Sequence, residues 1–219
     1  MKTKYQYIKT IAVVILAIGI ILPANAQQDQ EISTLFGNRE GGIDHGGWGA
    51  LTFGYSKVND KDTYLMGARG GWLIDHHFTI GLAGNGIISD KEYYELDLED
   101  PTKGFNLAGG YGGLFFEAII APNSPVHVTI PVIIGAGGIS YIENSSWNDY
   151  NNNYEPYILD SDAFFVFEPG LEIELNLVRF MRLSVGGSYR YTSKVDMVGT
   201  SETMLRGFNG YFGLKFGAF

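Results

Sequence analysis

The chain of 219 residues contains no cysteine, so no disulfide can hold its fold together. It also lacks any apolar run of about 20 residues, the length that a transmembrane helix needs. No long stretch keeps a helical period with capping residues, and a turn near residues 32–36 is the only helical element that we expect after the N-terminal segment. These absences exclude a disulfide scaffold and argue against a helical membrane protein and a helix bundle.

Acidic residues are in excess and glycine is abundant. The formal net charge is −9, and 30 residues are glycine, whereas about 7% is usual. Glycine at this density disfavours long helices, and its scatter through apolar segments matches neither a linker nor a collagen repeat. The acidic balance makes the chain a poor candidate for binding nucleic acid or an anionic membrane surface.

The N-terminus has the three parts of a secretory signal peptide in order. Lys2, Lys4 and Lys9 precede an apolar run from Ile11 to Leu22, and Ala24-Asn25-Ala26 supplies small residues for cleavage. The run is too short for a membrane anchor, and no cysteine follows it to carry a lipid. We expect residues 1–26 to be a signal peptide, which leaves an acidic chain of net charge −12, and residues 27–47 to be a loose leader.

Eight segments rich in β-forming residues follow, and each is bounded by turn signals. They are Trp48 to Val58, Thr63 to Ile74, Phe78 to Ser89, Phe105 to Ile120, Val126 to Tyr141, Ala163 to Leu175, Phe180 to Thr192 and Met204 to Phe219. The connections between them alternate in length: 75–77, 121–125 and 176–179 are short, whereas 90–104, 142–162 and 193–203 are long. The loop at 59–62 is the exception: it is short, although it falls at the end of the barrel that has the long connections. This pattern predicts an all-β, eight-stranded, antiparallel up-and-down transmembrane barrel over residues 48–219, with both termini at the short-turn end.

Most of these segments have one apolar and one polar face. In Ala163 to Leu175, for example, Phe165, Phe167 and Leu171 alternate with the glutamates of the other face. A soluble barrel would place the apolar face inside, and a membrane barrel would place it in lipid. Alternation alone is consistent with either kind of barrel. Aromatic residues near the strand ends, an apolar face almost free of charge and a terminal Phe219 favour the membrane barrel.

In a membrane barrel the polar face lines the lumen and carries four acids and four bases. They are Arg69, Glu117, Glu168, Glu172, Glu174, Arg182, Arg190 and Lys215. Equal numbers predict a closed ion-pair network and a plugged interior without an open pore. The turn before Phe180 predicts that Arg182 lies directly opposite Glu172 or Glu174. For Lys215 and Glu117, a position in water at a rim is the alternative.

The sequence offers little catalytic chemistry, and we expect no enzyme, cofactor or metal site. His76 and His77 fit a solvated turn better than a metal site. The half of the barrel with long loops has no histidine to activate a serine for lipid hydrolysis. The acidic loop of residues 90–100 lacks the ligand spacing of an EF-hand and is interpreted as a solvated charge run, with divalent-cation binding left open. Four aromatic residues of a long loop are typical of a contact surface: Trp147, Tyr150, Tyr154 and Tyr157.

The last segment combines an outward aromatic row with a terminal residue of the opposite parity. Phe212, Leu214 and Phe216 share one face, whereas Phe219 falls on the other. Two explanations are open: a bulge near Gly217 resets the register, or Phe219 lies beyond the last paired residue. We expect this strand to pair antiparallel with Trp48 to Val58, because a barrel joins its last strand to its first.

The signal peptide, the eight alternating segments, the asymmetric connections and the terminal aromatic together resemble the small OmpA/OmpX-type outer-membrane barrels of Gram-negative bacteria. The resemblance covers residues 46–219 and includes no periplasmic domain. It implies a location in the outer membrane, contact with its lipid, and a C-terminal signal (Phe212, Leu214, Phe216 and Phe219) that the barrel-assembly machinery reads. It carries over no catalytic or ligand residue.

The first functional hypothesis is a non-enzymatic outer-membrane protein that supports envelope integrity or makes surface contacts through its long loops, with no nucleic acid partner. A barrel enzyme or a carrier acting on lipid or another small ligand is the alternative. A secreted soluble barrel that binds an apolar ligand is a third class.

Overall fold

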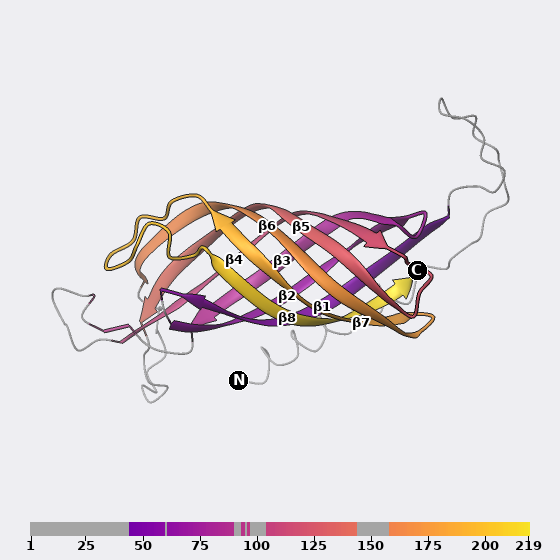
Figure 1. Ribbon diagram of the computed structural model, residues 1–219. Helices are drawn as coiled ribbons and strands as arrows, with labels where there is room; N and C mark the ends of the chain where they lie inside the picture. The colour runs from indigo at the N-terminus through magenta and orange to yellow at the C-terminus, as the bar shows by residue number, and fades with distance from the viewer. Residues whose placement is uncertain (1–43, 60, 90–92, 95, 97–103, 144–157) are drawn as a thin grey trace, which may run out of the picture. The chain divides into compact units, whose positions relative to one another are not determined.

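A computed structural model describes residues 44–59, 61–89, 93–94, 96, 104–143 and 158–219. Eight strands form one closed antiparallel barrel in chain order, which confirms the predicted fold class (Figure 1). The strands are β1 His45–Val58, β2 Lys61–Ile74, β3 Phe78–Ser89, β4 Phe105–Ile120, β5 Val126–Glu143, β6 Ile158–Val178, β7 Met181–Thr192 and β8 Gly207–Ala218. The strand β1 begins three residues before the expected boundary, and β6 is longer than predicted at both ends. The proposed signal peptide and most of the leader lie outside the described residues.

The barrel closes through the pairing of β8 with β1. Leu51 lies opposite Leu214 and Phe53 opposite Phe212, and the pairing runs antiparallel from Ser56 to Gly47. The rings of Phe53 and Phe212 stack with centroids 5.7 Å apart. The predicted partner of the C-terminal strand is therefore confirmed.

Short turns and long connections lie at opposite ends of the barrel (Figure 1). The β2–β3, β4–β5 and β6–β7 turns share one end with the start of β1 and the end of β8. The β2–β3 turn has two successive residues in the left-handed region, Asp75 at φ 51° and His76 at φ 56°. Left-handed residues at both central positions match the twist of a tight hairpin.

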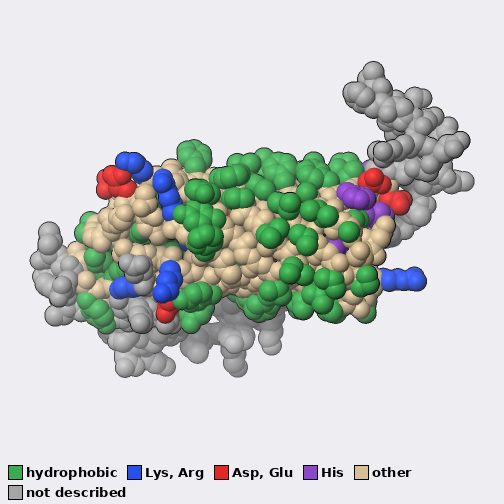
Figure 2. All heavy atoms as spheres, viewed as in Figure 1, with side chains coloured by type: hydrophobic (Ala, Val, Ile, Leu, Met, Phe, Trp, Pro, Cys, Tyr) green, Lys and Arg blue, Asp and Glu red, His purple; other side chains and the backbone are tan. Residues whose placement is uncertain are grey.

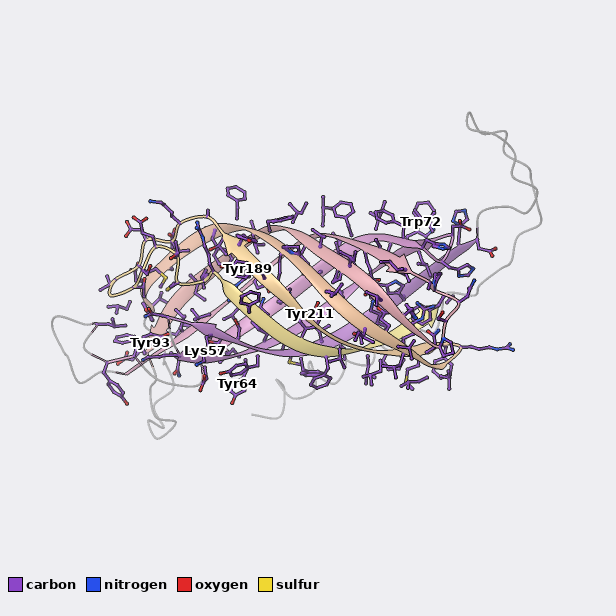
Figure 3. The ribbon with its side chains drawn as sticks, in the orientation of Figure 1. Lys57, Tyr64, Trp72, Tyr93, Tyr189 and Tyr211 are labelled. Atoms are coloured by element: carbon purple, nitrogen blue, oxygen red, sulfur yellow. The ribbon has the colours of Figure 1, made fainter. Side chains whose placement is uncertain are left out.

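The two faces of the wall are those of a membrane barrel. Large apolar side chains point outward, and among them Leu82 is 66%, Phe165 75% and Phe208 79% exposed. In the view of Figure 2, hydrophobic side chains cover the wall between the ends, while charged side chains and histidines gather at the ends. Figure 3 places Trp72 near the short-turn end and Tyr64 and Tyr189 toward the other. The alternation in the sequence could not distinguish a soluble barrel from a membrane barrel. The outward position of the apolar side chains identifies a membrane barrel.

Glycines on the inner face allow neighbouring strands to approach closely. Gly71 of β2 lies opposite Gly81 of β3, and a Cβ on Gly81 would collide with the carbonyl oxygen of Gly70. Glycine at such positions permits strong curvature in a narrow barrel.

The β7–β8 connection differs from the expected external loop. It runs from residue 193 to residue 206, because Met204 and Leu205 precede β8 and do not begin it. Both side chains are buried, as are those of Val195 and Met197. The connection therefore folds into the mouth of the barrel, since its apolar side chains pack better against the luminal wall than in water.

Among the described residues, no helix is both long and apolar enough to cross a membrane.

Candidate functional site: the lumen and its mouth

Most of the charged side chains in the lumen lie in the half nearest the short turns. Arg69 on β2 crosses to Glu172 on β6 through two hydrogen bonds, Nη1–Oε1 at 2.5 Å and Nη2–Oε2 at 2.7 Å. This fork-to-fork geometry is the strongest form of an arginine–carboxylate pair. Both side chains are buried, so each charge is compensated within the protein.

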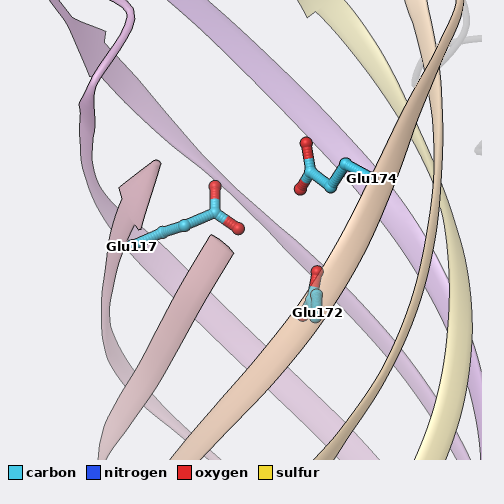
Figure 4. Close-up of side chains that lie close together, drawn as sticks. All are labelled: Glu117, Glu172 and Glu174. Atoms are coloured by element: carbon cyan, nitrogen blue, oxygen red, sulfur yellow. The ribbon is translucent and has the colours of Figure 1, made fainter. Parts of the chain in front are cut away.

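Lys215 on β8 joins three carboxylates. Its ammonium group donates to Glu117 at 2.5 Å and to Glu174, and Glu172 lies 3.8 Å away. The three glutamates each place an oxygen within 4.8 Å of the others, and Figure 4 shows them converging from two sides of the lumen. A cluster of this kind could ligate a metal ion, but the Lys215 ammonium already contacts all three residues. The Lys215 ammonium group thus occupies the position that a metal ion would take.

Glu174 also contacts two residues near the short-turn end. His127 Nε2 lies 3.1 Å from its Oε2, and Arg182 Nη1 lies 3.6 Å from the same oxygen. The prediction that Arg182 lies directly opposite a glutamate is wrong. Its opposite residue is Asn176, and Glu174 lies opposite Ser184, because the β6–β7 turn is tight and Val178 already pairs with Met181. The ion pair therefore forms diagonally between the strands.

The ionic cluster is packed among aromatic side chains. The Lys215 Nζ lies 4.3 Å from the centre of the Trp48 ring, and Arg69 lies over Phe115. The Trp48 indole donates to the Thr79 hydroxyl at 3.1 Å. Lys215 and Glu117 are each 1% exposed, so the alternative of a rim position in water is wrong for both.

Phe219 also enters the lumen. It follows Ala218, the last paired residue of β8, and no register shift interrupts the strand. Its ring packs against the apolar cluster around Trp48, and the Arg182 guanidinium lies 3.9 Å above it. Phe219 therefore lies beyond the last paired residue, and no bulge near Gly217 changes the register. This confirms one of the two explanations offered for why Phe219 falls on the opposite face from Phe216. Phe212, Leu214 and Phe216 face outward.

Glu168 is separate from this cluster and is held by neutral donors. Its carboxylate accepts hydrogen bonds from Tyr111 and Ser188, both at 2.5 Å, and from Asn209 at 2.9 Å. Beside it is a cavity of about 30 Å³, whose lining includes Arg69 and Tyr211. A volume of this size holds about two water molecules. The predicted network of eight charges is thus one balanced cluster of three acids and three bases, with Glu168 and Arg190 apart from it.

Apolar residues fill the half of the lumen nearest the long loops. They come from β1 to β6, from Tyr93 and from the β7–β8 connection. The Tyr93 and Tyr141 rings meet edge to face with centroids 5.2 Å apart. Burial raises the pKa of Tyr93 to about 12, so this phenol is neutral at physiological pH. The sequence analysis predicted a polar interior along the whole barrel, and this half of the lumen is apolar instead. The signal that it missed was a set of apolar residues close to the start of the last strand: Val195, Met197, Met204 and Leu205.

Arg190 lies at the base of this apolar filling. It is completely buried, and its Nε donates to the Leu205 carbonyl oxygen at 2.7 Å. Its Cζ is 5.7 Å from the centre of the Tyr111 ring. Neither Nη1 nor Nη2 has a hydrogen-bond partner among the described residues.

The loop residues Trp147, Tyr150, Tyr154 and Tyr157, and the acidic residues of the 90–100 loop, lie outside the described residues. The described histidines His45, His76 and His77 are at the short-turn end and partly or fully exposed. His76 lies 3.3 Å from Asp44, in an exposed pair.

No family model matches the chain, and no curated protein matches it. The fold is similar to that of solved outer-membrane proteins. Neisserial surface protein A shares 11% identity with a TM-score of 0.47, covering 80% of this chain and 98% of that one. The attachment invasion locus protein Ail of Yersinia pestis shares 9% identity with a TM-score of 0.41, covering 79% of this chain and 97% of that one. A second structure of Ail, in a phospholipid bilayer nanodisc, shares 12% identity with a TM-score of 0.35, covering 78% and 99%.

The chain's own architecture defines its class. It is an eight-stranded antiparallel barrel with an apolar outer wall and a filled lumen, which is charged toward the short turns and apolar toward the long loops. The prediction of a small OmpA/OmpX-type outer-membrane barrel is thus confirmed at the level of the fold.

Proposed function

We propose that this protein is a non-enzymatic integral protein of the outer membrane whose closed lumen conducts no solute. The observation that carries the proposal is the buried ionic cluster of Arg69, Glu172, Glu174, Lys215 and Glu117, which spans the lumen from β2 to β8. A passing ion would have to break several buried charge pairs at once, and breaking one such pair costs about 3–5 kcal/mol. The barrel then acts as a wall element and a platform for its loops.

In this proposal, residues 1–26 direct export and are removed, and the outward row Phe212, Leu214 and Phe216 is the part of the C-terminal strand that the assembly machinery reads. The long loops make the surface contacts, with Trp147, Tyr150, Tyr154 and Tyr157 as contact residues. The barrel contributes to envelope integrity through its contact with outer-membrane lipid. The exposed apolar wall weighs against a secreted soluble barrel, because such a wall would aggregate in water.

Two measurements test the proposal. Purified protein should migrate differently before and after heating in detergent gels, and it should give no stable single-channel conductance in planar bilayers. Conductance comparable to that of a general porin would contradict the closed lumen. Recovery of the native protein in an aqueous fraction without detergent would contradict membrane insertion.

The proposed role in the cell is tested by deletion in the source bacterium. The deletion strain should take up more of a hydrophobic dye that intact outer membranes exclude, and the full chain should restore exclusion. A chain with the four loop aromatics replaced by serine should also restore it while losing surface contacts. If the deletion strain excludes the dye normally, the integrity role is wrong.

Carriage of a small ligand is the second candidate, since the mouth contains a buried cation among apolar side chains. A lipid-modifying enzyme receives less support, because His127 is bonded to Glu174 in the half of the lumen away from the long loops.

A further inference from the structure

The β7–β8 connection closes the mouth of the barrel. Its end residues Ser193 and Arg206 bond to Phe165 and Thr192 of the wall, and Arg190 bonds to the Leu205 carbonyl oxygen between them. Asp162 accepts from the Asp196 amide at 2.7 Å, and Asp160 accepts from the Val198 amide at 2.9 Å. Within the connection, the Val195 amide donates to the Glu202 carbonyl oxygen at 3.0 Å. Side-chain contacts of this kind can open without disturbing the strand ladders.

Below the connection, the luminal wall is apolar and aromatic. Its members include Tyr93, Leu107, Tyr141, Phe164 and Val166, all at most 5% exposed. The four apolar side chains of the connection are packed against them. If the connection moved aside, the wall would line an apolar cup open toward the long-loop end.

Arg190 supplies a charge at the base of that cup. A guanidinium group has five N–H donors and stays ionised. Here the Nε donates to the Leu205 carbonyl, whereas Nη1 and Nη2 are buried without a partner in the described part of the chain. The Glu168 oxygens are already bonded to Tyr111, Ser188 and Asn209. The Tyr111 hydroxyl also interacts with Arg190, but it is neutral and supplies no opposite charge. A buried cation with no ion pair in the described part of the chain is costly, so this position favours an incoming anion.

We propose that the mouth is a binding site for an anionic amphiphile of the fatty-acid class. The acyl chain takes the place of Val195, Met197, Met204 and Leu205, and the carboxylate accepts hydrogen bonds from Arg190 Nη1 and Nη2. The site goes beyond the proposed structural role, and it requires no pore because the ionic cluster still closes the lumen beneath it. Burial of a long acyl chain offsets the exposure of the apolar side chains that it displaces.

The test uses the protein purified from membranes in a non-ionic detergent and a hexadecanoic acid that carries a diazirine at its tail. Its methyl ester is the matched neutral probe. After irradiation, mass spectrometry of the peptides locates the label. The acid should label the luminal side of the mouth, at residues such as Tyr141 and Phe164, whereas the ester should label only the outer wall. Labelling of the outer wall alone by both probes would overturn the proposal.

Two sets of variants examine the charge and the closure separately. Arg190→Gln should lower mouth labelling by the acid about tenfold or more, because a charge-assisted bidentate contact is lost. Arg179→Gln, an exposed arginine in the β6–β7 turn, is the control and should change nothing. Unchanged labelling in folded Arg190→Gln protein would show that the arginine has a structural role only, and would overturn the proposal.

The absence of native cysteine permits a lock on the connection. In a chain carrying Asp162→Cys and Asp196→Cys, oxidation should abolish mouth labelling and reduction should restore it. Equal labelling of the two forms would contradict entry beneath the connection. If Arg190→Gln fails to fold, as judged by heat-modifiable migration, the acid–ester comparison and this lock still decide the outcome.

Discussion

At the residue scale, Lys215 is where most of the buried charge in the lumen converges. Its side chain contacts Glu117, Glu172 and Glu174 and lies beside the Trp48 ring. Removing it would leave three carboxylates close together with only Arg69, Arg182 and His127 to compensate them. Buried like charges without a partner destabilise a fold strongly.

Lys215→Met should therefore lower the free energy of unfolding by about 3–5 kcal/mol, measured by urea titration of the refolded barrel. Lys57→Met, at an exposed outward position near the other end of the barrel, is the control and should change it by less than about 0.5 kcal/mol. Adding Glu117→Gln to Lys215→Met should recover part of the loss, because the two residues are coupled. Equal losses in the two lysine variants would contradict the central role of Lys215.

At the scale of the element, the β2–β3 hairpin depends on backbone conformations that suit glycine. Asp75 and His76 occupy the left-handed region, which costs a residue with a Cβ about 1–2 kcal/mol. The His77 amide donates to the Ile74 carbonyl oxygen at 3.1 Å and closes the turn.

His76→Gly should consequently raise the free energy of unfolding by about 1 kcal/mol in the same titration. His77→Gly, one residue further and outside the left-handed region, should lower it, since glycine there only adds freedom to the unfolded chain. A loss of stability in His76→Gly would mean that the turn has a different conformation.

The C-terminal strand has a terminal residue with a role of its own. Because Phe219 continues the inward parity of β8, its ring covers Arg182 and the Trp48 cluster at the short-turn end. Phe219→Ala should lower the free energy of unfolding by about 1–3 kcal/mol through lost packing and cation–π contact. Ala218→Gly, beside it on the outer face, should have a smaller effect. If Phe219→Ala leaves stability unchanged, the ring does not pack in the lumen.

At the scale of the whole molecule, the sequence predicted the architecture because it repeats one local signal eight times. Alternation assigned Glu168, Glu172 and Glu174 to a single face, and the asymmetric connections predicted an up-and-down order with both termini at the short-turn end. These properties depend on neighbouring residues along the chain, and short-range patterns record them well.

The pairing of charges across the lumen could not be predicted in the same way. Arg69 meets Glu172 from four strands away, and this partnership depends on the register of all the intervening strands. The tight β6–β7 turn sets Arg182 opposite Asn176, so its pair with Glu174 is diagonal. The inward folding of Val195 and Met197 left an apolar signal in the sequence, but polar neighbours in the same segment masked it.

The barrel has lipid outside and protein side chains filling its lumen, and accessibility along one strand tests this arrangement directly. Because the chain has no cysteine, single cysteines along β3 can carry a spin label in liposomes, with electron paramagnetic resonance measuring collisions with oxygen and with a water-soluble nickel chelate. Labels at outward positions 80, 82, 84 and 86 should collide often with oxygen and rarely with the chelate, and labels at inward positions 79, 83 and 85 rarely with either. High chelate collision at the outward positions, or no alternation along the strand, would contradict this arrangement of lipid and side chains.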